Sequence, residues 1–372
     1  MKKILMISLL VLVNFVSISV CAQDSIIEMY NEIGIDDMIS SAQENFPEFD
    51  GEEIVNMLSS GTAFDNKKIL DIITDFLFKN TKKLTKAFIL IVVVGYVISV
   101  VHTTSLAFGG GSAQIAFLVG YTIFSGMLIS VIAEIISPAK ETIQTLITMI
   151  KAIIPTLLTL MTFSGGANTS VLMSSLLVSM INVISLILGN FLINIIMATL
   201  ALSVADKMSD RINITSAIKS LKHFVKWVLL FCMAIYSGIY GVYGLAGSAL
   251  DSRLGKATRF AVGSSVPIVG GVVSDSIEVI LGTVGAVRSL TGVVGIIAIC
   301  AVALYPILKT ALVMWLLRLS AAVLEPVSDK RIVQLTTDIA DSVSAIFAIL
   351  VSVSLLFIGC VGVILISGNF IS

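Results

Sequence analysis

The chain has 372 residues, of which 57% are apolar and 13% are charged, and its formal net charge is −1. Soluble domains carry about 25% charged residues, so this composition excludes an ordinary soluble domain, a disordered chain and a nucleic-acid-binding protein. Many apolar runs approach the ~20 residues that cross a bilayer as a helix. We therefore predict an all-α fold, a polytopic transmembrane helical bundle embedded in lipid.

Residues 1–22 have the pattern of a secretory signal peptide. A basic start precedes an apolar run, and Val20 and Ala22 occupy the −3 and −1 positions of a small-residue cleavage site. The alternative is an uncleaved first helix. A lipoprotein signal at Cys21 fits less well, because bulky Val20 lies directly before the cysteine. Cleavage would place the next residues on the extracytoplasmic side.

Residues 23–86 form an acidic region, which we expect to contain short amphipathic helices outside the cytoplasm. Residues 23–66 include eleven acidic residues and neither lysine nor arginine, and the apolar residues recur at helical spacing. The lysines at 79–86 are expected to meet the membrane, where such side chains snorkel. Residues 87–372 are predicted to form a multi-pass transmembrane domain with about six to eight membrane segments.

The first segments of this domain are separated by glycines and prolines. The first crossing, at 87–108, is followed by a second that we expect Pro138 to stop, and then by an apolar stretch at 142–163. Residues 171–205 contain no charged residue over 35 positions. A helix this long must tilt, extend or break, and Gly189-Asn190 is the expected breaking point.

A charged connection at 206–226 sets the expected orientation. Its five basic residues favour the cytoplasmic side. This agrees with an extracytoplasmic start only if 142–163 does not fully cross. Later crossings are expected at 227–247, 292–318 and 343–366. The first of these has glycine at every third position from Gly238, which indicates close helix contact or, alternatively, a glycine-lined permeation path.

Two interrupted segments stand out in the apolar domain. In one, Pro155 is followed by Gly165 and Gly166, and in the other Pro267 is followed by Gly270 and Gly271. Non-helical backbone in lipid must be covered by protein or face a water-filled cavity, and transporters often carry paired interruptions of this kind. We hypothesise that the two segments are re-entrant or broken and meet at the centre. The alternative is two unrelated kinked helices.

Ionisable residues within apolar stretches are the second feature. Glu278 and Lys309 lie near the middle of such stretches, and Asp275 lies nearer an end. A charge at the bilayer centre costs at least ~2.5–3.5 kcal/mol, so we expect Glu278 and Lys309 to form a buried pair or to line a cavity. A purely structural pair that locks two helices is the alternative.

Catalytic and metal-binding patterns are absent from the sequence. The chain has two histidines and four isolated cysteines, and neither a metal-ligand spacing, a phosphate-binding loop nor a serine nucleophile motif occurs. We therefore expect no enzyme activity, no cofactor and no metal.

Several stretches resemble the stage III sporulation protein AE family of endospore-forming Firmicutes. They are "SSVPIVGGVVSDSIE" at 264–278, "EPVSDKRIV" at 325–333 and "SLAFGGGSAQIAFLVGY" at 105–121. The first is the most specific, because a glycine-rich run beside acidic residues is unusual in membrane helices. The likeness extends over nearly the whole chain, including the signal, the acidic region and the order of crossings.

The resemblance implies a multipass component of the channel complex that joins mother cell and forespore, located in the mother-cell membrane around the forespore. The implied partners are the ATPase, the ring-forming proteins and the small membrane proteins of the stage III sporulation A operon, with the forespore-side channel protein reached indirectly. Within it, a permease-like or pore-associated role is expected. The alternatives are a non-transporting scaffold and a stand-alone secondary transporter.

Overall fold

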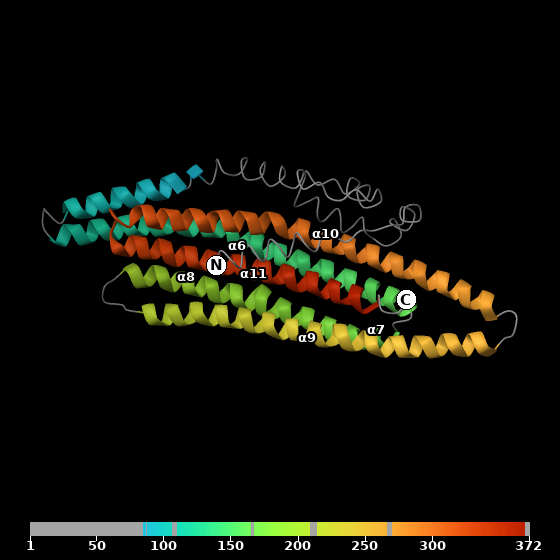
Figure 1. Cartoon of the computed structure of the whole chain (residues 1–372). Coiled ribbons are helices and arrows are strands. Elements are labelled where there is room, and N and C mark those ends of the chain that lie inside the picture. Colours follow the sequence, from blue (N-terminus) through green and yellow to red (C-terminus); the bar gives the residue numbers. More distant parts are fainter. Residues whose placement is uncertain are drawn as a thin grey trace.

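The computed structural model describes the backbone of residues 85–86, 88–105, 110–164, 167–208, 214–265 and 270–368, and the side chains of these residues except 110–113, 168, 242–283, 286, 290, 367 and 368. Long helices lie side by side in one elongated bundle (Figure 1). A helix over Phe88–Ser105 comes first. The others are α6 (Gly110–Phe163), α7 (Ala167–Ile184), the π-helix η1 (Ser185–Phe191), α8 (Leu192–Met208), α9 (Thr215–Ser265), α10 (Gly270–Leu324) and α11 (Lys330–Gly368).

Six helices in the described ranges are long and apolar enough to cross a membrane. This confirms the all-α polytopic bundle. The predicted signal peptide, and the acidic region up to residue 84, lie outside the described residues.

The helix α6 corrects the expectation that Pro138 stops a crossing. It is continuous over 54 residues and contains both Pro138 and Pro155. The hydroxyl groups of Thr142 and Thr159 each donate to the carbonyl of the proline four residues earlier, at 2.8 Å. A helix of this length measures about 81 Å, against ~30 Å of bilayer hydrocarbon. The predicted second crossing, 114–136, and the stretch 142–163 are therefore parts of one helix, and Gln114–Phe163 is a single candidate membrane span.

The break expected near Gly189 and Asn190 is not found, and the helix is instead locally widened there. There the chain forms η1, seven residues of π-helix between two α-helices. A single π-turn accommodates one extra residue without ending the helix. The Asn190 side-chain amide donates to the carbonyl of Ser185 at 3.3 Å. Gly189 is buried, and a Cβ on it would lie 3.3 Å from Ile143 of α6.

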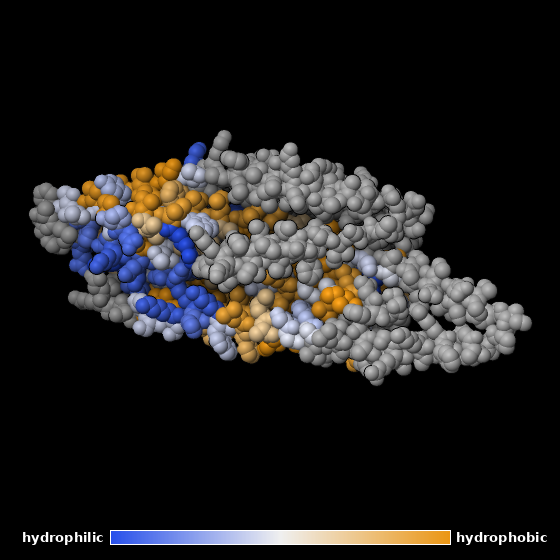
Figure 2. Space-filling model, in the orientation of Figure 1, coloured by the Kyte–Doolittle hydropathy of each residue, from blue (hydrophilic) through white to orange (hydrophobic). Residues whose placement is uncertain are grey.

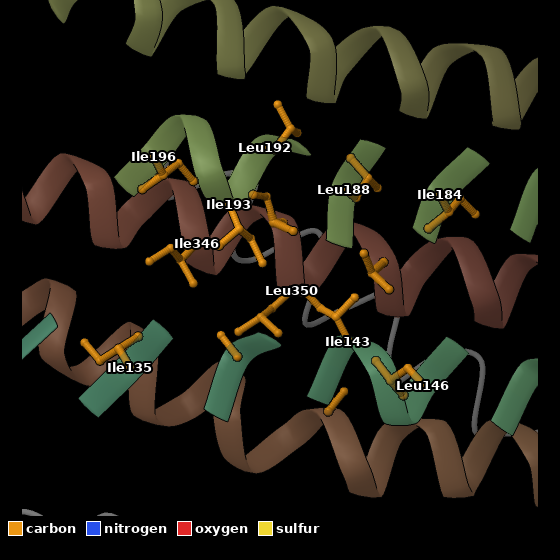
Figure 3. Close-up of a cluster of buried hydrophobic side chains, with 14 of the residues drawn as sticks. Ile135, Ile143, Leu146, Ile184, Leu188, Leu192, Ile193, Ile196, Ile346 and Leu350 are labelled. Atoms are coloured by element: carbon orange, nitrogen blue, oxygen red, sulfur yellow. The ribbon is translucent and has the colours of Figure 1, made fainter. Parts of the chain in front are cut away.

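The central helix is α11, which contacts α6, α7, α8, α9 and α10. No residue between Ser342 and Leu365 is exposed. The close-up in Figure 3 shows Ile346 and Leu350 of α11 between Ile143 of α6 and Ile193 of α8. All four are nearly inaccessible to solvent. Van der Waals packing of this kind holds helices together in a solvent as apolar as they are.

Glycines of α9 give a second correction. Gly238 and Gly241 are exposed, and a Cβ on either would meet nothing within 4 Å. In the described part of the chain, no other helix therefore packs closely against these two glycines. The side-chain surroundings of residues 244 and 247 lie outside the described part.

Candidate functional site

Polar side chains gather at one end of the bundle, where α8 is followed by α9 and α10 by α11. Figure 2 shows this end as a hydrophilic region beside a largely hydrophobic body. The helices bring together residues from distant parts of the sequence here, and three sets of interactions organise them.

The first set centres on Asp206, whose side chain is 2% exposed at the end of α8. Its carboxylate accepts hydrogen bonds from the backbone N–H of Ile214 at 2.8 Å, the Thr215 hydroxyl at 2.7 Å and the Lys207 ammonium at 2.7 Å. The N–H groups in the first turn of a helix have no helical acceptor. Asp206 therefore joins the end of α8 to the start of α9.

The second set links three helices through Lys222 of α9. Its ammonium lies 2.7 Å from Asp338 and 3.3 Å from Asp341, both in α11. Arg318 of α10 reaches Asp341 at 3.6 Å. Because these groups are only partly exposed, their attraction is screened less than that of fully exposed ion pairs.

The third set joins the helix over Phe88–Ser105 to the α10–α11 connection. His102 lies 3.5 Å from the Asp329 carboxylate, and the Ser99 hydroxyl accepts a hydrogen bond from the Asp329 N–H at 3.2 Å. The guanidinium of Arg331 lies 4.7 Å from the ring centre of Phe117, a cation–π distance.

Lys309 occupies a different place, in the second half of α10. Its ammonium donates to the carbonyl oxygen of Glu134 in α6 at 3.3 Å. In an uninterrupted helix that carbonyl would accept from the N–H of residue 138, but Pro138 has none. Lys309 therefore fills the gap that Pro138 leaves in the hydrogen bonding of α6.

The prediction that Glu278 and Lys309 of the same chain form a pair is wrong. Both residues belong to α10 and are 31 positions apart, so a rise of 1.5 Å per residue separates their backbones by about 46 Å.

The other predicted positions are only partly described. Pro155 lies inside α6 and is exposed, so α6 is not broken there. Gly270 and Gly271 begin α10, and Asp275 lies in its second turn. Pro267, Gly165 and Gly166 lie outside the described residues, as do the side chains of Asp275 and Glu278. Their proposed meeting at the centre of the bundle stays a prediction.

Among the described charged residues, Arg288 is the most buried. Its residue is 1% exposed, and its guanidinium donates to the Leu365 carbonyl near the end of α11 at 3.4 Å. The last carbonyls of a helix lack helical donors, so this arginine stabilises the end of the central helix.

The sequence did not lead to a prediction for two groups of polar residues. The ion pairs of Lys222 join positions 116 and 119 residues apart, and a single sequence gives no signal for such pairs. The exposed polar residues of α6 between 141 and 162, with Pro155 among them, recur every three or four positions. This helical spacing could have shown them as one face.

These features define a polytopic all-α membrane protein with an apolar core, one polar end and a central helix. A family model described as Stage III sporulation protein AE matches residues 49–368. The chain belongs to this family, and is therefore a sporulation-related multipass membrane protein.

A curated relative, Stage III sporulation protein AE of Bacillus subtilis (strain 168), is 24% identical over 257 residues. The match covers 69% of this chain and 64% of the relative, so it spans less than two thirds of that protein. No solved structure matches the chain.

Proposed function

We propose that this chain is a pore-associated component of the channel complex between mother cell and forespore, and that it lies in the mother-cell membrane around the forespore. Family membership supports the link with sporulation. On this proposal the polar end, rich in lysine and arginine, faces the mother-cell cytoplasm, and residues 23–84 lie outside it.

The observation that carries the pore-associated role is the packing of α11. A permease that conducts through its own centre needs a hydrated interior between its helices. Here the central helix has no exposed residue from Ser342 to Leu365, and its neighbours pack apolar side chains around it. A path for polar solutes would therefore run along the outside of this bundle, beside another member of the complex.

The proposal is tested by replacing the corresponding gene of a spore former with one for the full chain. We expect heat-resistant spores and late forespore transcription to depend on it, and the tagged chain to co-purify with the operon's ATPase and ring-forming proteins. Normal sporulation without the chain, or purification of the chain free of these partners, would overturn the proposal.

A scaffold without a transport role is the second candidate, and the same dry core favours it. The two are separated by following a small polar dye from mother cell to forespore. A pore-associated protein requires passage to fall when its path-lining residues are made apolar, while partner co-purification persists. A scaffold requires passage and co-purification to change together.

A further inference from the structure

The outer surface of the bundle includes a polar face on the second half of α6. Its members are exposed and, with Pro155 counted in the row, recur every three or four residues, so they lie on one side of the helix. We define the α6 polar face as Glu141, Gln144, Thr148, Lys151, Thr159 and Thr162. Pro155 lies in the same row and is exposed. It also frees the carbonyl of Lys151, since a proline at 155 cannot donate to it.

A second polar row follows the neighbouring helical segment α7–η1–α8. We call this row the asparagine row, and it consists of the exposed residues Ser175, Ser179, Asn182, Asn190 and Asn194. In a regular α-helix, the side chains of Asn182 and Asn194, twelve residues apart, would point in directions about 120° apart around the helix axis. The π-turn accommodates one extra residue, which reduces this angle by about 100°. The π-helix η1 therefore keeps the three asparagines on one face.

The two rows adjoin each other. The Thr162 hydroxyl donates to Ser170 at 2.9 Å, and Ser170 donates to the Leu158 carbonyl at 2.9 Å. Farther along, the Gln144 side-chain nitrogen lies 4.0 Å from the Cβ position of Gly189, next to Asn190. The α6 polar face thus runs beside the asparagine row from one of these contacts to the other.

Contacts with α9 place part of this surface beside Thr215–Gly241, a stretch long and apolar enough to cross a membrane. The Tyr236 hydroxyl donates to the Met180 carbonyl at 3.1 Å, and the rings of Phe191 and Phe224 are 6.5 Å apart. The exposed Lys226 of α9 is followed by an outward surface that is apolar from residue 227 to 235. Its large members are Trp227, Leu230, Phe231 and Ile235, each between 43% and 69% exposed.

Side by side, then, residues 227–235 of α9 present an apolar surface suited to lipid and the second half of α6 presents a polar one, whereas η1 exposes both Asn190 and the apolar Leu186 and Phe191. In the described part of the chain no hydrogen bond or ion pair reaches the side chains of Gln144, Lys151, Asn182 or Asn194. Lipid offers these groups no partner, and a polar group without one costs several kcal/mol there. The threonines have less need of an outside partner, because the hydroxyls of Thr148 and Thr159 donate to backbone carbonyls of their own helix.

We infer that the α6 polar face and the asparagine row border water within the membrane and form one wall of a path for small hydrophilic solutes. This inference rests on the proposed pore-associated function. It specifies which side of the bundle faces the path. Water would supply the hydrogen bonds that the amides, the lysine and the freed Lys151 carbonyl need.

Cysteine labelling in sporulating cells tests the inference. Cys21, Cys232, Cys300 and Cys360 are first replaced by alanine, and single cysteines are introduced as Thr148→Cys and Asn190→Cys. Leu230→Cys on α9 and Leu350→Cys in the core are the matched controls. Because thiol reagents attack the thiolate, which forms in water, a charged, membrane-impermeant reagent should modify the first two positions at least about tenfold faster than either control.

Labelling no faster than at Leu230→Cys would overturn the inference, since the face would then lie against lipid. Labelling that occurs only after the other operon proteins are deleted would also overturn it, because a protein would then cover the face. Only variants that still support spore formation are compared. As a second measurement, Asn182→Leu with Asn190→Leu should reduce dye passage without lowering the amount of chain in the membrane.

The outcomes separate the inference from the proposed function. If sporulation requires the chain but both positions stay unlabelled, the hydrated face fails and the proposed function stands. If both positions label in a chain that sporulation does not require, the proposed function fails and the hydrated face stands.

Discussion

Lys309 and Pro138 compensate each other across the contact between α6 and α10. The proline removes one backbone donor from α6, and the lysine ammonium donates to the carbonyl that lost it, at 3.3 Å. The hydrogen bond satisfies the carbonyl at the first of the two prolines that the 54-residue helix contains. It also gives a structural role to a charge that lies in the middle of an apolar stretch.

This relationship predicts non-additive stability effects. Lys309→Met should lower the free energy of unfolding in mixed micelles by about 1 kcal/mol, the usual range for one interhelical hydrogen bond in a membrane protein. In a Pro138→Ala background the same change should cost close to nothing, because the N–H of the new alanine serves the Glu134 carbonyl. Tryptophan fluorescence from Trp227 and Trp315 can follow unfolding. Equal losses in both backgrounds would contradict the coupling, and Lys140→Met is the exposed control.

Two glycines of α6 should respond oppositely to the same substitution. A Cβ on Gly120 would lie 2.8 Å from Ile98 Cγ2, whereas a Cβ on Gly126 would meet nothing within 4 Å. Gly120→Ala should therefore destabilise the protein by about 1–3 kcal/mol through overpacking against a β-branched residue. Gly126→Ala should be neutral or stabilising by up to about 1 kcal/mol, since alanine favours the helix.

The comparison requires both proteins to be unfolded under the same conditions and followed by the same fluorescence signal. A stabilising Gly120→Ala would mean that the first helix can move away from α6. The described contact between Ile98 and Gly120 would then not limit the packing.

The sequence predicted best what depends on local pattern. Apolar runs identified the membrane helices, and Gly189-Asn190 within a charge-free stretch marked the place of the π-helix, although a break was expected there. The effect of Pro138 was mispredicted because Lys309, which supplies the hydrogen-bond donor that Pro138 lacks, lies 171 positions away. Thr142 donates to the proline's own carbonyl and is the local part of the arrangement.

The candidate site was harder to predict, because it depends on which helices are neighbours. Lys222 meets Asp338 only after α9 and α11 pack side by side. Glu278 and Lys309 were matched by charge alone, and the continuity of α10 separates them. Hydropathy also gave no warning that 142–163 continues the preceding helix, since a proline within an apolar run fits a break and a continuation equally.

Asp206 should be among the least replaceable polar residues. Asp206→Ala removes the acceptor of three hydrogen bonds and leaves the Ile214 N–H without its partner, so we expect a loss of about 2–3 kcal/mol in the free energy of unfolding. Asp206→Asn keeps an oxygen for that N–H and should cost less. Thr215→Ala removes one of the three bonds and should have the smallest effect. Equal effects of all three substitutions would contradict a capping role.

The two carboxylates that Lys222 contacts should contribute unequally. Asp338 is closer, at 2.7 Å against 3.3 Å, and its side chain is 23% exposed against 40% for Asp341. Asp338→Asn should lower the free energy of unfolding by about 1 kcal/mol at low salt, and Asp341→Asn by less than half of this. Raising the salt should shrink the Asp338→Asn loss, because counterions screen a partly exposed pair. Lys222→Met combined with Asp338→Asn should cost little more than either single change. If the two losses simply add, the ammonium and the carboxylate do not stabilise each other.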